Sequence, residues 1–371
     1  MQTQADIILY GVHLSYYSGK TRAHLKYKGV NFEEKRISKR ALMEDILPVA
    51  GTPIIPVIKT QSGQLVQDTT EILDFIEQSY PKASVYPSTP KQKLAALLLE
   101  FYGDEWLLLP AMHYRWSHLD KHHDFIMKEF GVQVTRSEDP EEQIAAGIEH
   151  SKPFRNSIKW LGIQAETEDA IEQRYLQDLA LLNQRFGKSD FLFGSRPSVA
   201  DFGLMGPLYA HLGRDPYPKA IMQECAPHVY QWLQRMNKPQ PLTGEFANND
   251  DISPQVLQLL HHQALEQLPD VSSVIRANEA YMKLNPDNNI PRTLGFHPFT
   301  IGGVKSTRLI STYTQWMFQR SYDFYHSLGA DDKQSCTELL AQVGALPYFQ
   351  KPINARVKRQ YGQLELVQDR G

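Results

Sequence analysis

The chain has 371 residues, of which 42% are hydrophobic and 22% charged, a composition typical of a globular protein long enough for two domains. The formal net charge is only −3, so no general positive field is present to attract a nucleic acid, and we expect no such partner. The two cysteines, Cys225 and Cys336, fit no metal-binding or CxxC spacing, which favours a reducing compartment over a disulfide framework.

The N-terminal sequence MQTQADIILYG lacks the basic region and the long apolar run of a signal peptide. The most apolar segment, 94–112, is interrupted by Glu100, Asp104 and Glu105, and charged residues are costly inside a bilayer. We therefore predict a cytoplasmic protein with no membrane partner.

Residues 6–79 carry the pattern of a small α/β unit. Residues 7–10 form a continuous apolar run, as buried parallel strands do. A helix is predicted over about 19–28, with Ser18 as its N-cap and Gly29 at its end. Two further elements follow: a strand over 32–37 and a short helix over 40–47.

The stretch 54–76 predicts a β-hairpin followed by a helix. Strands over 54–59 and 65–67 flank a turn at Gln61-Ser62-Gly63. Asp68 is placed to cap the next helix, with Glu71 as its reciprocal capping partner. The predicted order of this unit is therefore βαβ followed by ββα.

The rest of the chain is predicted to be helical. Residues 80–90 contain three prolines and no periodicity, which indicates a linker. We predict an α+β protein with domains at 1–80 and 91–240, a linker at 81–90, and a mostly helical extension at 241–371. Within the last two parts, helices are expected over 91–123, 141–162, 168–186, 199–212, 217–236, 254–268, 271–284, 309–328 and 333–343.

Two places in the first unit are candidate binding features. A cis peptide bond before Pro56 would turn the backbone groups of Ile55 outward to pair with an extended peptide, whereas a trans proline at the start of a strand is the alternative. The helix that begins after Asp68 exposes unpaired N–H groups that suit a carboxylate, and the Asp68 side chain suits an ammonium group. Capping alone also explains Asp68.

The start of the first helix is a third candidate. A thiolate there would be stabilised by the helix dipole and by a hydroxyl donor. The alternative is that Ser15 and Ser18 only form the turn and the cap.

Several other motifs are interpreted as structural. Ser198 and Asp201 form a capping box that starts a buried helix. His118, His122 and His123 lack an HExxH frame or a cysteine partner, so we interpret them as a solvated helix face and predict no metal. Core packing is expected for Tyr313, Trp316, Met317 and Arg320, with a lid over a pocket as the alternative, and a solvated basic tail for Arg356, Lys358 and Arg359.

In their order and spacing, three segments resemble the glutathione transferase superfamily over residues 6–240. The resemblance implies a thioredoxin-like domain joined to an all-helical domain, usually in a homodimer, with glutathione as co-substrate and no metal. The extension after about residue 240 has no counterpart in typical members. The three segments are LSYYSGKTRAHLKYKGVNFEE, IIPVI followed by LVQDTTEILDFIE, and FLFGSRPSVADFGLMGPLYAHL.

The resemblance also implies roles for individual residues. Ser15 aligns with the serine that activates the glutathione thiol, with Tyr10 as runner-up and Tyr17 as a further candidate. The backbone of Ile55, beside a cis Pro56, would pair with the cysteinyl unit. The remaining contacts are expected in two groups: Gln67, Asp68, Thr69, Lys39 and Thr52 around glutathione, and Tyr16, Tyr102, Trp106, Met112 and Tyr114 around the second substrate.

The expected function is that of a detoxifying glutathione transferase, in which the thiolate attacks a small hydrophobic electrophile. The alternative is a non-catalytic module of the same fold that binds a ligand or a protein and whose function lies in the extension. A metal-dependent activity is much less expected than either, because the sequence shows no convincing set of metal ligands.

Overall fold

The computed structural model describes residues 5–38, 40–51, 53–238, 243–286, 289–360 and 362–367. The first part is a four-stranded sheet in the order β2-β1-β3-β4, in which β1 pairs parallel with β2 and antiparallel with β3. The predicted βαβ-ββα order is confirmed. Its elements are β1 (Ile7–Tyr10), α1 (Tyr16–Tyr27), β2 (Phe32–Lys35), β3 (Val57–Thr60), β4 (Leu65–Gln67) and α3 (Thr69–Ser79).

Helix α1 begins three residues earlier than predicted. Its N-cap is Ser15, whose Oγ accepts a hydrogen bond of 3.2 Å from the Ser18 amide, while Ser18 Oγ accepts from the Val12 amide. Tyr16 and Tyr17 therefore lie in the first turn, and both hydroxyls donate to backbone carbonyls of the helical part of the chain. This anchoring across the domains is not visible in the local sequence pattern.

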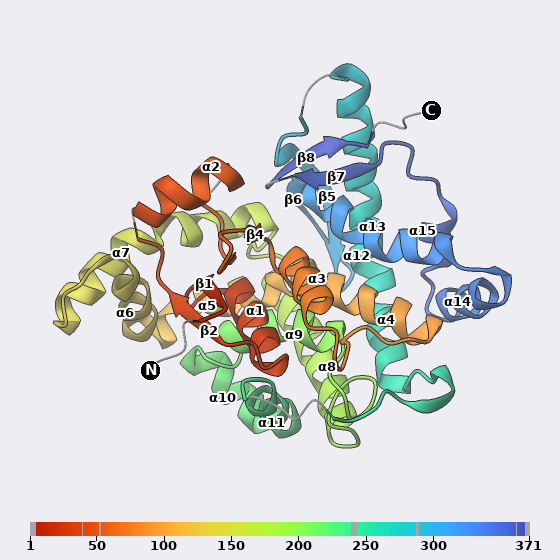
Figure 1. The fold of residues 1–371 in the computed structure, drawn as a ribbon, viewed down its shortest axis with the longest axis horizontal. Coiled ribbons are helices and arrows are strands. Elements are labelled where there is room, and N and C mark those ends of the chain that lie inside the picture. The colour runs from red at the N-terminus through yellow and green to blue at the C-terminus, as the bar shows by residue number, and fades with distance from the viewer. Residues whose placement is uncertain are drawn as a thin grey trace.

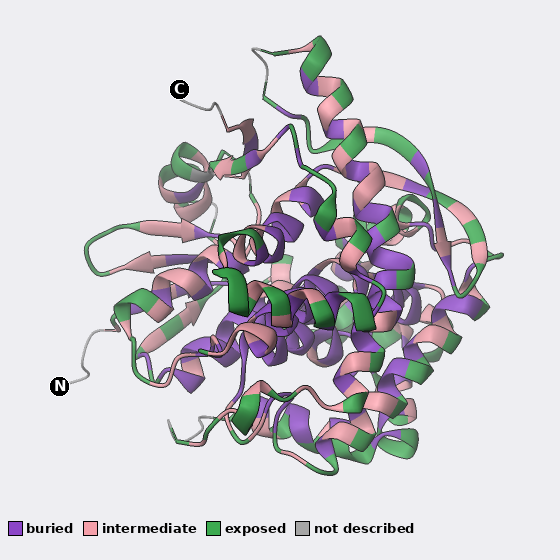
Figure 2. Cartoon of the chain, turned by 90° about the vertical axis from the view of Figure 1, so that its right-hand side faces the viewer, coloured by how far each residue is buried: buried purple, intermediate pink, exposed green. Residues whose placement is uncertain are grey.

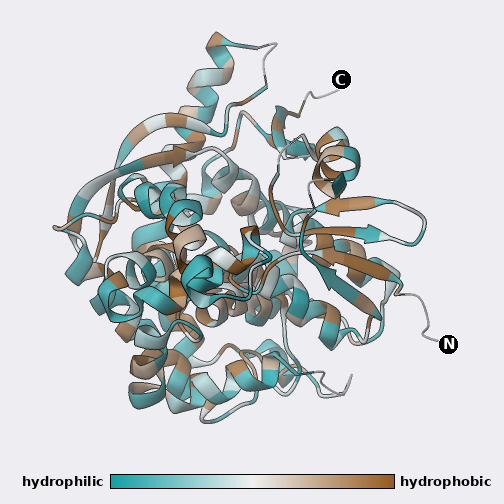
Figure 3. Ribbon diagram, turned by 90° about the vertical axis from the view of Figure 1, so that its left-hand side faces the viewer, coloured by the Kyte–Doolittle hydropathy of each residue, from teal (hydrophilic) through white to brown (hydrophobic). Residues whose placement is uncertain are grey.

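The connection from β2 to β3 also differs in detail from the prediction. The strand ends at Lys35, and the expected short helix is a π-helical segment, Ala41–Ile46, followed by α2 (Leu47–Ala50). Strand β1 of the small sheet is largely hydrophobic, whereas β2 is largely hydrophilic (Figure 3). Ile7, Leu9 and Ile58 pack there against α1 and α3.

The second part of the chain is helical, as predicted, but the expected long helix over 91–123 is broken. Pro110 lacks the N–H that an uninterrupted helix would need, and a π-helical segment, η2, precedes it. The helical elements are α4 (Pro90–Phe101), η2 (Tyr102–Trp106), α5 (Leu108–Trp116), α6 (His123–Val134), α7 (Pro140–Ser157), α8 (Glu168–Phe186), α9 (Val199–Ala210), α10 (Pro216–Cys225) and α11 (Pro227–Met236), with short 3₁₀ turns at Leu119–Lys121, Ile158–Leu161 and Asn248–Asp250.

Helix α9 is buried along nearly its whole length, and buried residues concentrate in the interior of the molecule (Figure 2). The predicted capping box is confirmed: the Ser198 side chain accepts from the Asp201 amide, and Asp201 Oδ2 accepts from the Ser198 amide at 2.8 Å. Asp201 Oδ1 also accepts from Trp232 Nε1. A Cβ on Gly103 would lie only 2.5 Å from the backbone of Gly203, so these glycines allow η2 to approach α9 closely.

The C-terminal extension contains two β-hairpins that the helical prediction missed. More buried and more exposed residues alternate along much of 293–311, on either side of Gly302-Gly303. Both glycines have positive φ and form the hairpin turn. The two predicted helices over 254–284 are one helix that continues through Pro269. The elements are α12 (Pro254–Leu284), β5 (Thr293–Ile301), β6 (Val304–Ser311), α13 (Tyr313–Ser327), α14 (Ala330–Gln342), α15 (Leu346–Gln350), β7 (Val357–Gln360) and β8 (Gln363–Leu366).

The extension packs on the helical part through a continuous core. Helices α12 and α13 contact α4 (Figure 1), and the rings of Phe101 and Phe318 lie 6.0 Å apart between centroids. Leu260, Phe318 and Leu339 belong to the same buried cluster as Leu98 and Phe202. No helix in the described part of the chain is long and apolar enough to cross a membrane.

Candidate functional site

A cavity of about 220 Å³ lies where the sheet, the helical part and the extension meet. The segment before β3 and the β4–α3 junction contribute one wall, and η2 contributes acidic groups. The extension forms the opposite wall. Residues from each source include Ile55, Asp68 and Thr69 from the first domain, Asp104 and Glu105 from η2, and Arg308, Tyr313, Met317 and Arg359 from the extension.

The Ile55–Pro56 peptide bond is cis, which confirms that expectation. Among the described residues, none forms a hydrogen bond with the Ile55 backbone, although the neighbouring Ile54 carbonyl accepts one of 2.9 Å from Gln67 Nε2. Because Ile55 lines the cavity, its N–H and C=O are available to an extended ligand.

Asp68 caps helix α3 as predicted, but its partners are not those expected. Its Oδ1 accepts from the Thr70 amide at 2.9 Å, and its Oδ2 accepts from the Tyr313 hydroxyl at 2.6 Å. Glu71 is not the reciprocal capping partner, because its carboxylate pairs with Arg359. Asp68 has φ of 88°, a conformation that aspartate and asparagine tolerate better than most residues.

The Arg359 side chain is only 4% exposed and lines the cavity, so the expectation that it belongs to a solvated basic tail is wrong. Its Nη1 donates to the Gln67 carbonyl at 2.9 Å and to Glu71, and its Nη2 donates to Gln67 Oε1 at 3.2 Å. The guanidinium group thus connects β7 to the junction of β4 and α3. Its fork of N–H donors suits these several oxygen acceptors, as is common for buried arginines.

Three hydroxyl groups were candidates for thiol activation, and the structure separates them. Tyr17 lines the cavity, and its hydroxyl donates to the Asp104 carbonyl at 3.2 Å. Burial raises the pKa of Tyr17 well above its ordinary value, which keeps the phenol protonated and able to donate. Ser15 is half-buried and acts as a helix cap outside the cavity lining, and Tyr10 packs in a small core with Ile46 and Val57.

The acidic wall of the cavity depends on a buried lysine that the sequence analysis did not identify. Lys20 Nζ lies 2.7 Å from Glu100 Oε1 and 2.6 Å from Asp104 Oδ2. Burial raises the pKa of Asp104 to about 7 and that of Glu105 to about 8. In the sequence, Glu100, Asp104 and Glu105 interrupt the most apolar segment, which indicates buried acids without identifying Lys20 as their partner.

The residues expected around the second substrate lie elsewhere. Their side chains are buried in the main core, and none lines the cavity; they are Tyr16, Tyr102, Trp106, Met112 and Tyr114. Apolar contacts to the cavity come instead from Leu108, Leu161, Ile290, Met317 and Leu364. Lys39 and Thr52 fall outside the described residues.

The helix with Tyr313, Trp316, Met317 and Arg320 packs against the core, as expected, and also lines the cavity. Met317 is buried in the core, and Tyr313 and Met317 also line the cavity. Arg320 pairs with Asp74 of α3 at 2.7 Å. Helix α13 therefore forms part of the cavity wall.

Two family models match the chain. Residues 9–84 match the glutathione S-transferase N-terminal domain, and residues 164–235 match the glutathione S-transferase C-terminal domain. The matched ranges contain the cis proline, the Asp68 cap and the Ser198–Asp201 capping box. The extension lies outside both matches.

Several solved structures are similar to part of the chain. The β-etherase LigF from Sphingobium sp. strain SYK-6 is 21% identical with a TM-score of 0.42, over 64% of this chain and 96% of that one. A Tau class glutathione S-transferase from mango, Mangifera indica, is 18% identical with a TM-score of 0.39, over 64% and 90%. Glutathione transferase GSTFuA3 from Phanerochaete chrysosporium is 15% identical with a TM-score of 0.42, over 64% and 99%.

Proposed function

Because the chain belongs to the glutathione transferase superfamily, we propose that it binds glutathione in this cavity and activates its thiol toward a small hydrophobic electrophile. The observation that carries the proposal is the convergence of three groups on one cavity: the backbone of Ile55, to which no described residue forms a hydrogen bond, the capped helix start at Asp68 and Thr69, and the Tyr17 hydroxyl. These groups match the peptide, the charged end and the sulfur of glutathione.

The γ-glutamyl end of glutathione carries an ammonium and a carboxylate group. Asp68 supplies negative charge for the ammonium, and its carboxylate has lone pairs beyond those used by Thr70 and Tyr313. The first amides of α3 and the Arg359 guanidinium supply positive charge for the carboxylate at the same end. The cysteinyl unit then pairs with the Ile55 backbone, as an added strand does.

Thiol activation is assigned to Tyr17. An unperturbed thiol has a pKa of about 8.5 and is mostly protonated at neutral pH, and each unit of depression corresponds to about 1.4 kcal/mol in favour of the anion. When glutathione binds, the Tyr17 hydroxyl turns its single hydrogen from the Asp104 carbonyl to the sulfur and stabilises the thiolate in this way. Ser15 is the competing candidate, with the N-terminus of α1 contributing its dipole.

The second substrate is expected to be small and apolar. The cavity, at about 220 Å³, is below the roughly 300–1,000 Å³ of typical small-molecule sites, so little space remains beside glutathione. Leu108, Leu161 and Met317 offer an apolar surface for it.

The test compares Tyr17→Phe with Ser15→Ala in the full chain. The ultraviolet absorbance of bound glutathione thiolate and turnover of a model aryl halide are measured for both. We expect Tyr17→Phe to lose the thiolate signal and about 100-fold in turnover, as when one preorganised donor is removed. Ser15→Ala should keep both, with a stability loss of about 1 kcal/mol from the missing cap.

Tyr230→Phe is a matched control, since Tyr230 does not line the cavity. Full activity in Tyr17→Phe together with loss in Ser15→Ala would transfer the role to Ser15. Full activity in both variants would refute activation of the thiol by either hydroxyl.

A non-catalytic binding module is the second candidate, and one observation favours it. Tyr313 and Arg359 of the extension already occupy Asp68 and Gln67 at the glutathione end of the cavity. Calorimetry separates the two candidates: the absence of glutathione binding at millimolar concentration would support the module and exclude the transferase.

A further inference from the structure

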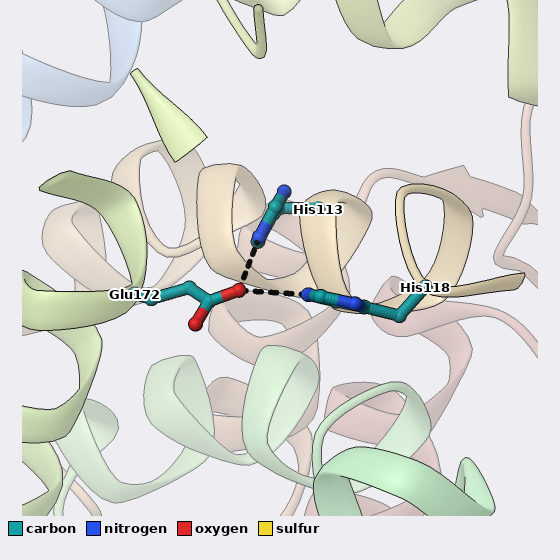
Figure 4. Close-up of side chains that lie close together, drawn as sticks. All are labelled: His113, His118 and Glu172. Atoms are coloured by element: carbon teal, nitrogen blue, oxygen red, sulfur yellow. Dashed lines mark hydrogen bonds and ion pairs between the residues drawn. The ribbon is translucent and has the colours of Figure 1, made fainter. Parts of the chain in front are cut away.

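Two histidines and a glutamate converge away from the cavity (Figure 4). His113 lies in α5, His118 just after it, and Glu172 in the first turns of α8. Glu172 Oε1 lies 2.9 Å from His113 Nε2 and 2.7 Å from His118 Nε2. The three possible ligand atoms lie within 4.8 Å of one another.

The contacts of His113 continue beyond the cluster through Ser117 to Glu168. Glu168 Oε1 contacts Ser117 Oγ at 3.0 Å, Ser117 Oγ contacts His113 Nδ1 at 2.9 Å, and His113 Nε2 contacts Glu172. Three contacts need three hydrogens, which the Ser117 hydroxyl and a doubly protonated imidazole supply between two carboxylates. A cation coordinated by His113 Nε2 and Glu172 Oε1 takes the place of the Nε2 proton and leaves the other two contacts unchanged.

The surroundings suit a metal ion that keeps one open position. The His113 side chain is only 1% exposed, which fixes the ring, whereas His118 is 25% and Glu172 is 32% exposed. Ser117 holds the second ring nitrogen of His113, an outer-shell contact typical of metal-bound histidines. Solvent on the exposed side can supply a further ligand.

We propose that His113, His118 and Glu172 bind a divalent transition-metal ion, with zinc the expected occupant. Two histidines and one glutamate form a known ligand set for zinc, with bonds of about 2.0–2.2 Å and a water molecule as the fourth ligand. The side chains need to separate by only a few tenths of an ångström to admit the ion. The ion would link the end of α5 to the start of α8.

The proposed site holds a metal where none was expected, and it uses other residues than the three histidines considered in the sequence. His122 is buried, and its Nε2 contacts the Arg115 carbonyl at 3.0 Å. His123 lies at the surface, and its Nδ1 contacts Asp124. Of the three histidines in SHLDKHHDF, only His118 joins the cluster, and its partners His113 and Glu172 come from outside that motif.

The experiment is calorimetric titration of the chelator-treated full chain with zinc chloride, repeated for His118→Ala, Glu172→Gln and the control His123→Ala. We expect one zinc ion per wild-type chain, at least about 100-fold weaker binding in the first two variants, and a change below about 2-fold in the control. Zinc should raise the Tm of the wild type and not that of Glu172→Gln.

Cobalt chloride provides a second probe, because a four-coordinate cobalt(II) site absorbs visible light. The band should form in the wild type and in His123→Ala and be lost in Glu172→Gln. Absence of saturable zinc binding, or equal binding by all four proteins, would overturn the proposal. Neither measurement uses glutathione, so this result is independent of the proposed transferase activity.

Discussion

The hydroxyl of Tyr313 donates a 2.6 Å hydrogen bond to Asp68, a residue 245 positions earlier in the chain. Asp68 belongs to the domain matched by the family model, whereas Tyr313 belongs to the extension outside it. Arg359 makes a parallel connection to Gln67. The extension is thus a structural part of the candidate glutathione site.

Tyr313→Phe should weaken glutathione binding without changing the fold. The variant loses the hydrogen bond that orients the Asp68 carboxylate, which is worth about 1 kcal/mol, so we expect roughly a 5-fold rise in the glutathione dissociation constant. Calorimetry measures the change. Tighter glutathione binding by the variant would show instead that Tyr313 competes with the ligand for Asp68.

Asp68→Asn should separate the charge of this residue from its capping role. Asparagine caps helices about as well as aspartate and tolerates positive φ, so the loss of stability should be limited to about 1 kcal/mol from the Tyr313 hydrogen bond, which the amide nitrogen cannot accept. Glutathione affinity should fall at least about 10-fold, because the partner of the ammonium group is lost.

Asp68→Ala serves as the comparison in that experiment. It removes the cap as well, and we expect an additional loss of about 1 kcal/mol in the free energy of unfolding. Unchanged glutathione affinity in Asp68→Asn would show that the carboxylate does not bind the ligand.

Glu105→Gln should make the protein more stable at high pH. Burial raises the pKa of Glu105 to about 8 from an ordinary 4.5, so the folded state retains a proton that the unfolded state has released between these values. Ionising this group therefore lowers the free energy of unfolding as pH rises from about 4.5 to 8. Glutamine avoids the loss and still accepts from Thr314.

The measurement is the difference in unfolding free energy between Glu105→Gln and wild type across this pH range. We expect a difference near zero at pH 4.5 that grows to about 3 kcal/mol at pH 8, because one pKa unit corresponds to about 1.4 kcal/mol and partial solvent contact reduces the full value. The control is Glu224→Gln, at an exposed position of α10. A difference that does not vary with pH would contradict the prediction.

Deletion of residues 241–371 should abolish cooperative folding. The faces of α4 that α12 and α13 cover would be exposed, together with the partners of Leu260, Phe318 and Leu339. Burial of each such side chain contributes about 1.5–3 kcal/mol, and their sum exceeds the stability of most domains. A thermal scan of the truncated protein by circular dichroism measures this.

Arg359→Ala is the appropriate comparison for the deletion, because it opens the cavity while leaving the core intact. It should fold and melt cooperatively. A soluble, cooperatively melting truncated chain would show that the extension docks on a domain that is already stable.

Patterns confined to a few neighbouring residues were determined by the sequence itself. The βαβ-ββα order, the Asp68 cap and the Ser198–Asp201 capping box all depend on alternation or on hydrogen bonds within one helical turn. The hairpin over 293–311 depends on an equally local pattern, the alternation on either side of Gly302-Gly303, although the sequence analysis assigned no strand there.

Only the tertiary structure decided which residues share a site. Arg359 meets Gln67 across 292 positions, Lys20 meets Asp104 across 84, and His113 meets Glu172 across 59. Each pair joins separate elements whose relative placement depends on packing of the whole core, so sequence spacing carries no information about their contact. For the same reason, the aromatic residues expected around the second substrate lie in the core while the extension lines the cavity.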